Sequence, residues 1–191
     1  MSMRVLGLDP GTATFGWGVV ETGGARPAHV AHGALRTAAT LTLGARLSIL
    51  RDGVTTLIEE HRPDRIAIER IFSQSNVQSA VAIGAVRGVA LLIAADHKIE
   101  VVEATPSEMK RAIAGEGRAT KAAVTKAITK LLALQTAPTP DDAADALACA
   151  TSHAHASRLT ASISASASAS GAGLLQTRRG ARVRRGRLIA S

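Results

Sequence analysis

The chain has 191 residues, of which 46% are hydrophobic but only 2% aromatic, and its net charge is +8. This length suits one domain with an aliphatic core and an appendage, and the single cysteine, Cys149, excludes an intramolecular disulfide and the ligand spacing of a zinc site. We find no signal-peptide pattern and no apolar run of membrane-spanning length, so we expect a cytoplasmic protein with no membrane partner.

Three short strands are predicted at the N-terminal end, at Arg4–Leu8, Gly16–Glu21 and His29–Leu35. The links between them are short and rich in turn residues, which favours an antiparallel arrangement. Apolar residues then recur at helical spacing from Leu43 to Ile58, so we expect an amphipathic helix that ends before Pro63.

The middle of the chain predicts a strand, a helix and a strand. Arg65–Glu69 and Ile99–Val102 have strand character, and Asn76–Ala95 reads as a helix whose only charge is Arg87. A strand–helix–strand unit implies a parallel pair with a right-handed crossover. A helix so apolar is usually buried, here by the core on one side and a second subunit on the other.

Three more helices complete the domain. Thr105 and Thr139 each precede a proline and an acid, a pattern that predicts a capping threonine with proline at the first helical position. Thr120–Leu132 is helical by its spacing, and the last helix runs to about His155. We therefore predict an α/β fold, a five-stranded mixed sheet with three antiparallel strands followed by two parallel strands and with helices on its faces.

The positive charge is concentrated at the C-terminal end. Residues 158–191 contain seven arginines and no acids, so this tail carries +7 and the rest of the chain +1. Its alternating Ser/Ala run and its Arg/Gly stretch are low-complexity patterns that do not form a packed core. We predict a folded domain of residues 1–157 and a basic, disordered tail of residues 158–191 with weak attraction to DNA.

Four acids stand at the ends of predicted elements. Asp9 and Glu69 each end a strand, and Asp142 and Asp145 lie three apart on one helix face. Simpler explanations exist: Asp9 starts a turn, Glu69 is a solvated charge or a partner for Arg70, and Asp142 caps a helix. Asp145 is harder to explain in this way, because an acid among alanines is uncommon without a partner.

Carboxylates that converge on one point repel each other unless a cation lies between them. Hard divalent cations such as Mg²⁺ bind to a few such oxygens together with water and substrate phosphate. If the four acids do converge, they form a metal-dependent phosphoryl-transfer or nuclease site.

Taken together, the segments around these acids resemble the RuvC family of Holliday-junction resolvases, which has the ribonuclease-H-like fold. The resemblance covers roughly residues 1–157. It rests on Leu6-Gly-Leu-Asp9-Pro-Gly-Thr12 with Gly16-Trp-Gly-Val19, Ala67-Ile-Glu69 with Phe72, Gly84-Ala-Val-Arg87-Gly-Val-Ala90, and Asp142-Ala-Ala-Asp145-Ala-Leu-Ala148.

The resemblance implies that Asp9, Glu69, Asp142 and Asp145 are catalytic and bind two divalent metal ions, Mg²⁺ with Mn²⁺ as a substitute. One metal would activate water and the other would stabilise the leaving 3′-oxygen, giving a 5′-phosphate and a 3′-hydroxyl. The expected activity is resolution of four-way DNA junctions by paired symmetric nicks in recombination and repair. A homodimer supplies the two sites, and a branch-migration motor of the RuvA and RuvB type is the implied partner.

The same resemblance places Lys110 and Lys121 at the DNA backbone, and Phe72 against an unpaired base. The alternatives are a solvated helix surface for the lysines and a small core plug for Phe72. His153 is about 12 Å along the helix from Asp145, too far to bind the same ion, so we interpret His153 and His155 as structural or surface residues.

Three other functions are open to a chain with these features. The nearest is a ribonuclease-H-like nuclease that processes ribosomal RNA precursors, which the Asp142–Asp145 motif and the Phe72 segment disfavour. A sugar-kinase or actin-like phosphotransferase needs a second domain and a second phosphate loop. A catalytically silent junction-binding module should lack some of the four acids.

Overall fold

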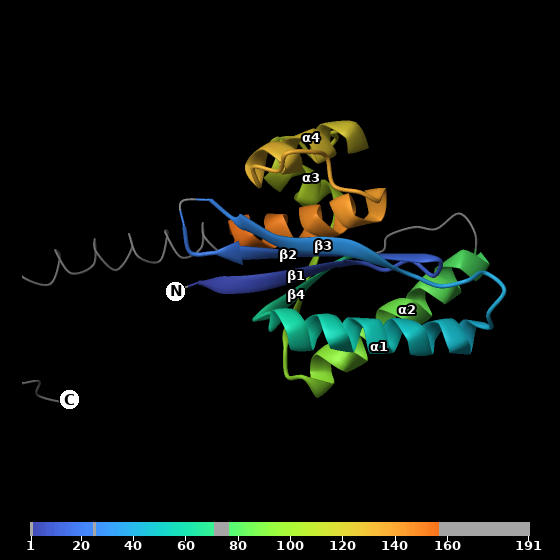
Figure 1. Cartoon of the computed structure of the whole chain (residues 1–191). Helices are drawn as coiled ribbons and strands as arrows, with labels where there is room; N and C mark the ends of the chain where they lie inside the picture. Colours follow the sequence, from blue (N-terminus) through green and yellow to red (C-terminus); the bar gives the residue numbers. More distant parts are fainter. Residues whose placement is uncertain (1, 25, 71–76, 157–191) are drawn as a thin grey trace, which may run out of the picture. The chain divides into compact units, whose positions relative to one another are not determined.

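The computed structural model describes residues 2–24, 26–70 and 77–156, in which a five-stranded sheet lies between two layers of helices (Figure 1). The strands are β1 (Met3–Asp9), β2 (Thr14–Thr22), β3 (Ala28–Arg36), β4 (Arg65–Glu69) and β5 (Glu100–Ala104). Their order is β3-β2-β1-β4-β5, with β1, β2 and β3 antiparallel and with β4 parallel to both β1 and β5. The predicted fold class is confirmed.

The helices divide between the two faces of the sheet. Figure 1 shows α1 (Leu43–His61) and α2 (Val77–Asp96) below it, and α3 (Pro106–Ala114) and α4 (Lys121–Leu131) above it. Residues 141–156 form a further helix, drawn in orange, between the sheet and the α3–α4 pair.

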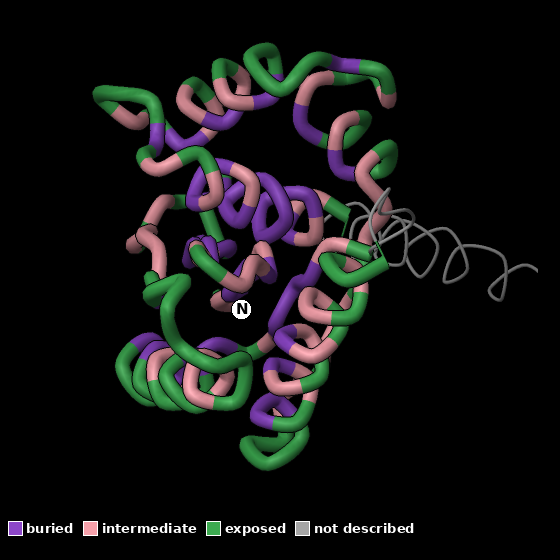
Figure 2. The backbone as a smooth tube through the Cα atoms, turned by 90° about the vertical axis from the view of Figure 1, so that its right-hand side faces the viewer, coloured by how far each residue is buried: buried purple, intermediate pink, exposed green. Residues whose placement is uncertain are grey.

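Alternating side chains of the strands build one hydrophobic core on each face of the sheet. Leu6 and Leu8 of β1 belong to the core that α1 and α2 cover. Val5 of β1 belongs to the core on the other face, which contains residues of α3, α4 and the 141–156 helix. Figure 2 shows buried backbone gathered between the layers, with the outer helix faces exposed.

Glycines let the 141–156 helix lie directly on the sheet. A Cβ atom at Gly7 would lie 2.0 Å from the carbonyl oxygen of Ala146, and one at Gly18 would lie 2.7 Å from the Leu147 side chain. Gly7 and Gly18 face each other across β1 and β2, so they form one flat patch without side chains. This patch explains how a helix so fully buried can pack against the sheet.

The two predicted threonine caps have different outcomes. Thr105 caps α3 as expected, with its hydroxyl accepting from the backbone N–H of Glu108 and the Glu108 carboxylate accepting from the N–H of Thr105. The prediction for Thr139 is wrong: helical residues begin at 141, and Pro140 precedes the helix in a bend that follows a cis peptide bond. The N–H of Ala143 bonds the carbonyl of Pro140, which closes this turn.

Helix α2 is less buried than its composition predicts. Only Val86, Ala90, Ile93 and Ala94 are buried, whereas Val81 is 65% exposed and Leu92 63% exposed. By length and composition alone α2 is apolar enough to cross a membrane, contrary to our reading of the sequence, with a mean hydropathy of 1.8. That criterion is weak, because core helices of soluble proteins also meet it, and α2 contributes four residues to the core beneath the sheet.

Candidate active site

The first two acids lie at the same edge of the sheet. Asp9 is the last residue of β1 and Glu69 is the last residue of β4. These strands are parallel neighbours in register from Val5–Arg65 to Leu8–Ile68, so their carboxyl ends lie side by side. Clefts at the carboxyl ends of parallel strands are the usual ligand sites of open α/β sheets.

The start of the 141–156 helix brings the other two acids to this edge. Gly16 pairs with Asp9 across β1 and β2, and a Cβ atom at Gly16 would lie only 2.1 Å from the carbonyl oxygen of Asp142. The helix therefore begins directly over the Asp9–Gly16 pair. Asp145 lies one turn further along, and both aspartates are partly buried.

Electrostatic interactions show that the four acids share one region. Burial raises the pKa of Asp9 from 3.8 to about 7, and the negative charges of Asp145, Glu69 and Asp142 add to the rise. Burial, and then Asp145, also raise the pKa of Glu69. The four acids therefore lie close enough to one another for their charges to interact.

Two lysines line a cleft together with two of the acids. The cleft has a volume of about 250 Å³ and is lined by Glu69, Asp145, Lys110 and Lys121 among others. The Lys121 ammonium lies 2.8 Å from Oδ2 of Asp145 and 3.6 Å from Oδ2 of Asp141. The hydrogen bond to Asp145 is the main cause of a raised Lys121 pKa, so Lys121 supplies a positive charge beside the acids.

The acids provide suitable donors for a divalent cation. Within the described part of the chain, no three His, Cys, Asp or Glu side chains are arranged to hold a metal ion as they stand, and one of the acids, Asp145, is paired with Lys121. Carboxylate oxygens are the ligands that Mg²⁺ prefers, and the raised pKa of Asp9 indicates that a cation would relieve the crowding.

The Asp9 pKa gives a prediction for the metal-free protein. Because the folded state raises this pKa from 3.8 to about 7, Asp9 lowers the free energy of unfolding progressively as pH rises through that range. We expect Asp9→Asn to stabilise the metal-free protein at pH 8 by roughly 1–3 kcal/mol, less than the full equivalent of the pKa change because Asp9 is partly solvated. Urea unfolding in EDTA at pH 8 and at pH 4 measures this difference.

The stabilisation should shrink toward zero near pH 4, where Asp9 is protonated in the folded wild type. Asp52→Asn is the control, because the Asp52 side chain is 66% exposed and its loss should change stability by less than about 0.5 kcal/mol. Added Mg²⁺ should stabilise the wild type more than Asp9→Asn. A destabilised Asp9→Asn at pH 8 in EDTA would contradict this account.

An arginine that the sequence analysis did not assign to the site supports Glu69. Arg87 of α2 donates to the carbonyl oxygen of Glu69 at 3.3 Å and also bonds the Glu103 carboxylate, which in turn pairs with Arg70 at 3.2 Å. Arg70 therefore pairs with Glu103, and the alternative of a Glu69–Arg70 ion pair is not the arrangement observed. The signal in the sequence was that Arg87 is the only charge in the apolar stretch from Asn76 to Ala95.

The remaining predicted residues lie away from the acids or outside the described residues. Phe72 lies outside the described residues. Nε2 of His153 lies 3.2 Å from Nη1 of Arg65, at the β4–β5 side of the helix, which agrees with a structural role. Asp141 is exposed and pairs with Lys121.

Comparison with known proteins gives consistent results. A family model described as "Crossover junction endodeoxyribonuclease RuvC" matches residues 5–153. Proteins with the same description from Rubrobacter xylanophilus and Chloroflexus aggregans are 48% and 47% identical over 149 and 151 residues. These alignments cover 78% and 79% of this chain, and 83% and 92% of the relatives.

Solved structures show the same likeness. The RuvC of Thermus thermophilus in complex with a Holliday junction substrate superposes with a TM-score of 0.79 at 31% identity, over 83% of this chain and 96% of that one. The yeast mitochondrial Holliday junction resolvase Ydc2 superposes with a TM-score of 0.61 at 15% identity, over 80% of this chain and 78% of that one, a likeness of fold.

Proposed function

Because the chain belongs to the RuvC family of crossover junction endodeoxyribonucleases, it is a metal-dependent nuclease that acts on Holliday junctions, and we propose that it cuts them at the edge of the sheet where its four acids lie. The observation that carries this proposal is the convergence of Asp145, Glu69 and Asp142 on Asp9, where burial and like charge raise the pKa of Asp9 to about 7. Crowding of these carboxylates does not stabilise the fold. A pKa perturbed in this way is typical of a residue in a functional site.

We assign the metal-binding role to the carboxylates of Asp9, Glu69, Asp142 and Asp145, with Mg²⁺ as the ion, two per site. When bound, Mg²⁺ lowers the pKa of the attacking water and places positive charge beside the leaving 3′-oxygen. Asp9 and Glu69 lie at the ends of β1 and β4. Asp142 and Asp145 lie on the 141–156 helix, which packs directly against glycines of the sheet.

The lysines of the cleft have a separate role in this proposal. Lys121 pairs with Asp145, and in this proposal the same ammonium also attracts the incoming phosphate. Lys110 lines the cleft on the side of Glu69. Both lysines would hold the DNA backbone as point charges and offset the charge of the acids.

Resolution of a four-way junction needs two cuts, and a homodimer supplies two sites. The exposed apolar side chains of α2, including Val77, Val81 and Leu92, support a homodimer through this helix, because monomers rarely expose such a patch. We propose that the dimer works in the cytoplasm and receives junctions from a branch-migration motor of the RuvA and RuvB type.

A synthetic four-way junction tests the proposed function. With Mg²⁺ or Mn²⁺, we expect two nicks at symmetric positions on opposing strands, and no comparable cutting of a linear duplex with the same sequences. DNA ligase should seal the products directly, since the expected ends are a 5′-phosphate and a 3′-hydroxyl. The control is the same incubation with EDTA, which should give no product.

A structured ribosomal RNA precursor in the same assay tests the alternative function. Preferential cutting of that RNA, or equal cutting of junction and duplex DNA, would overturn the proposed specificity. Nicks that accumulate singly, without a symmetric partner, would contradict the coupled action expected of a dimer.

A further inference from the structure

A second hollow lies outside the acid cleft, on the outer side of α4. This α4 groove has a volume of about 800 Å³ and shares Lys121 with the cleft. It is lined by Lys121, Ala122, Thr125, Lys126, Thr129, Lys130, Ala133, Leu134, Ala137 and Asp141.

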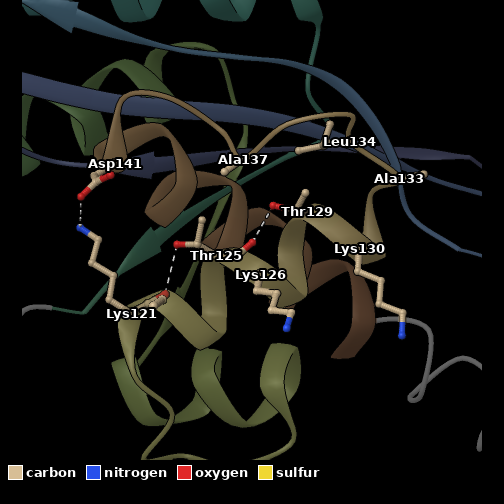
Figure 3. A pocket seen from close by; sticks show the side chains of 10 residues that line it. Lys121, Thr125, Lys126, Thr129, Lys130, Ala133, Leu134, Ala137 and Asp141 are labelled. Carbon is tan, nitrogen blue, oxygen red and sulfur yellow. Dashed lines mark hydrogen bonds and ion pairs between the residues drawn. The ribbon is translucent and has the colours of Figure 1, made fainter.

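The groove has a surplus of unneutralised positive charge. Lys126 and Lys130 are exposed and four residues apart, and Figure 3 shows them extending in the same direction. The one acid of the groove, Asp141, is paired with Lys121. Across the described ranges, neither Lys126 nor Lys130 forms an ion pair, so both ammonium groups are available to an anionic ligand.

The other polar side chains of the groove are already used within the helix. The Thr125 hydroxyl donates to the Lys121 carbonyl at 3.1 Å, and the Thr129 hydroxyl donates to the Thr125 carbonyl at 2.8 Å (Figure 3). The opposite wall consists of alanines and Leu134. A groove with two point charges and no free hydroxyl donor suits a sugar-phosphate backbone, and it offers nothing that distinguishes one base from another.

We propose that the α4 groove holds the backbone of the DNA arm that leads away from the cleaved phosphate, an inference that rests on the proposed function. Lys126 and Lys130 follow Lys121 by five and nine residues, about 7.5 and 13.5 Å along the helix axis. One DNA strand advances about 3.4 Å per nucleotide. With α4 aligned along the arm, these axial distances correspond to phosphates about two and four nucleotides from the scissile position.

The first experiment measures the salt dependence of junction binding in Ca²⁺ for the double variant Lys126→Gln/Lys130→Gln. Each phosphate contact contributes about 0.9 to the slope of log K against log salt, so the slope should fall by about 2 and the affinity at 0.1 M salt by roughly 10- to 100-fold. The matched control is Arg51→Gln/Lys98→Gln, which removes two exposed charges from the α1–α2 layer and should leave the slope unchanged.

The second experiment replaces single phosphates of the junction by neutral methylphosphonates. Substitutions about two to four nucleotides from the cut should weaken binding of the wild type several-fold and have no effect on the double variant. An unchanged slope, or equal effects of these substitutions on both proteins, would overturn the groove assignment. A wild-type protein that cuts no junction would instead contradict the proposed function, so the two failures are distinguishable.

Discussion

Asp145→Asn is expected to abolish junction cleavage while junction binding remains. The change keeps the size of the side chain and removes one of the charges that converge on Asp9. A metal site that loses one carboxylate ligand loses both cation affinity and transition-state stabilisation. We expect the single-turnover cleavage rate in Mg²⁺ to fall at least about 1,000-fold, equivalent to about 4 kcal/mol of activation free energy.

Binding of the junction should stay within a few-fold of the wild-type value or become tighter. The removed carboxylate faces a polyanion, so its loss lowers repulsion, and it releases Lys121, whose ammonium lies 2.8 Å from Asp145. The measurement is a gel-shift titration in Ca²⁺ beside a cleavage time course in Mg²⁺. A variant that loses both binding and cleavage would indicate that Asp145 supports the fold rather than the chemistry.

Asp141→Asn is the matched control for this experiment. It removes the same charge from the same helix, and Asp141 is also a partner of Lys121, at 3.6 Å. Because Asp141 does not contribute to the raised pKa of Asp9 or Glu69, its loss should change the cleavage rate by less than about fivefold. Cleavage by Asp145→Asn at the rate of Asp141→Asn would refute the site assignment.

The sequence predicts the elements of this fold well because their signals are local. The strands ending at Asp9 and Glu69 are short apolar runs closed by an acid, and the structure ends β1 and β4 at these residues. The rule for strand–helix–strand connections predicts the parallel β4–β5 pair, whereas the parallel pairing of β1 with β4, which brings the two acids to one edge, is visible only in the structure.

The details that the sequence could not predict are set by tertiary contacts. Thr139 and Pro140 have the same local pattern as Thr105 and Pro106, yet only the second pair starts a helix as expected, and the helix that follows Pro140 begins where the Asp142 backbone lies against Gly16 of the sheet. Arg87 reaches the Glu69 carbonyl from another element, a contact without any local signature. The Lys121–Asp145 ion pair also joins two different elements and has no local signature in the sequence.

Gly16→Ala is expected to separate the two halves of the active site. The added Cβ atom would lie 2.1 Å from the carbonyl oxygen of Asp142 and 2.9 Å from its Cβ, and these backbone-anchored atoms cannot turn aside. The 141–156 helix must shift away from the Asp9–Gly16 pair or the strand must deform, at a cost of about 3 kcal/mol or more in unfolding free energy. A displacement of about 1 Å at the acids should reduce cleavage about 100-fold.

Two further glycine variants test whether close approach is the cause. Gly44→Ala, in α1, meets nothing within 4 Å and should raise stability slightly, by less than about 1 kcal/mol, because alanine favours a helix. The Cβ atom added by Gly18→Ala would lie 2.7 Å from the Leu147 side chain, which can move. The stability and activity of this variant should therefore lie between those of Gly16→Ala and Gly44→Ala. Thermal unfolding, together with cleavage measured well below the unfolding temperature, orders the three variants. A Gly16→Ala protein with wild-type stability and activity would mean that the acids do not depend on this contact.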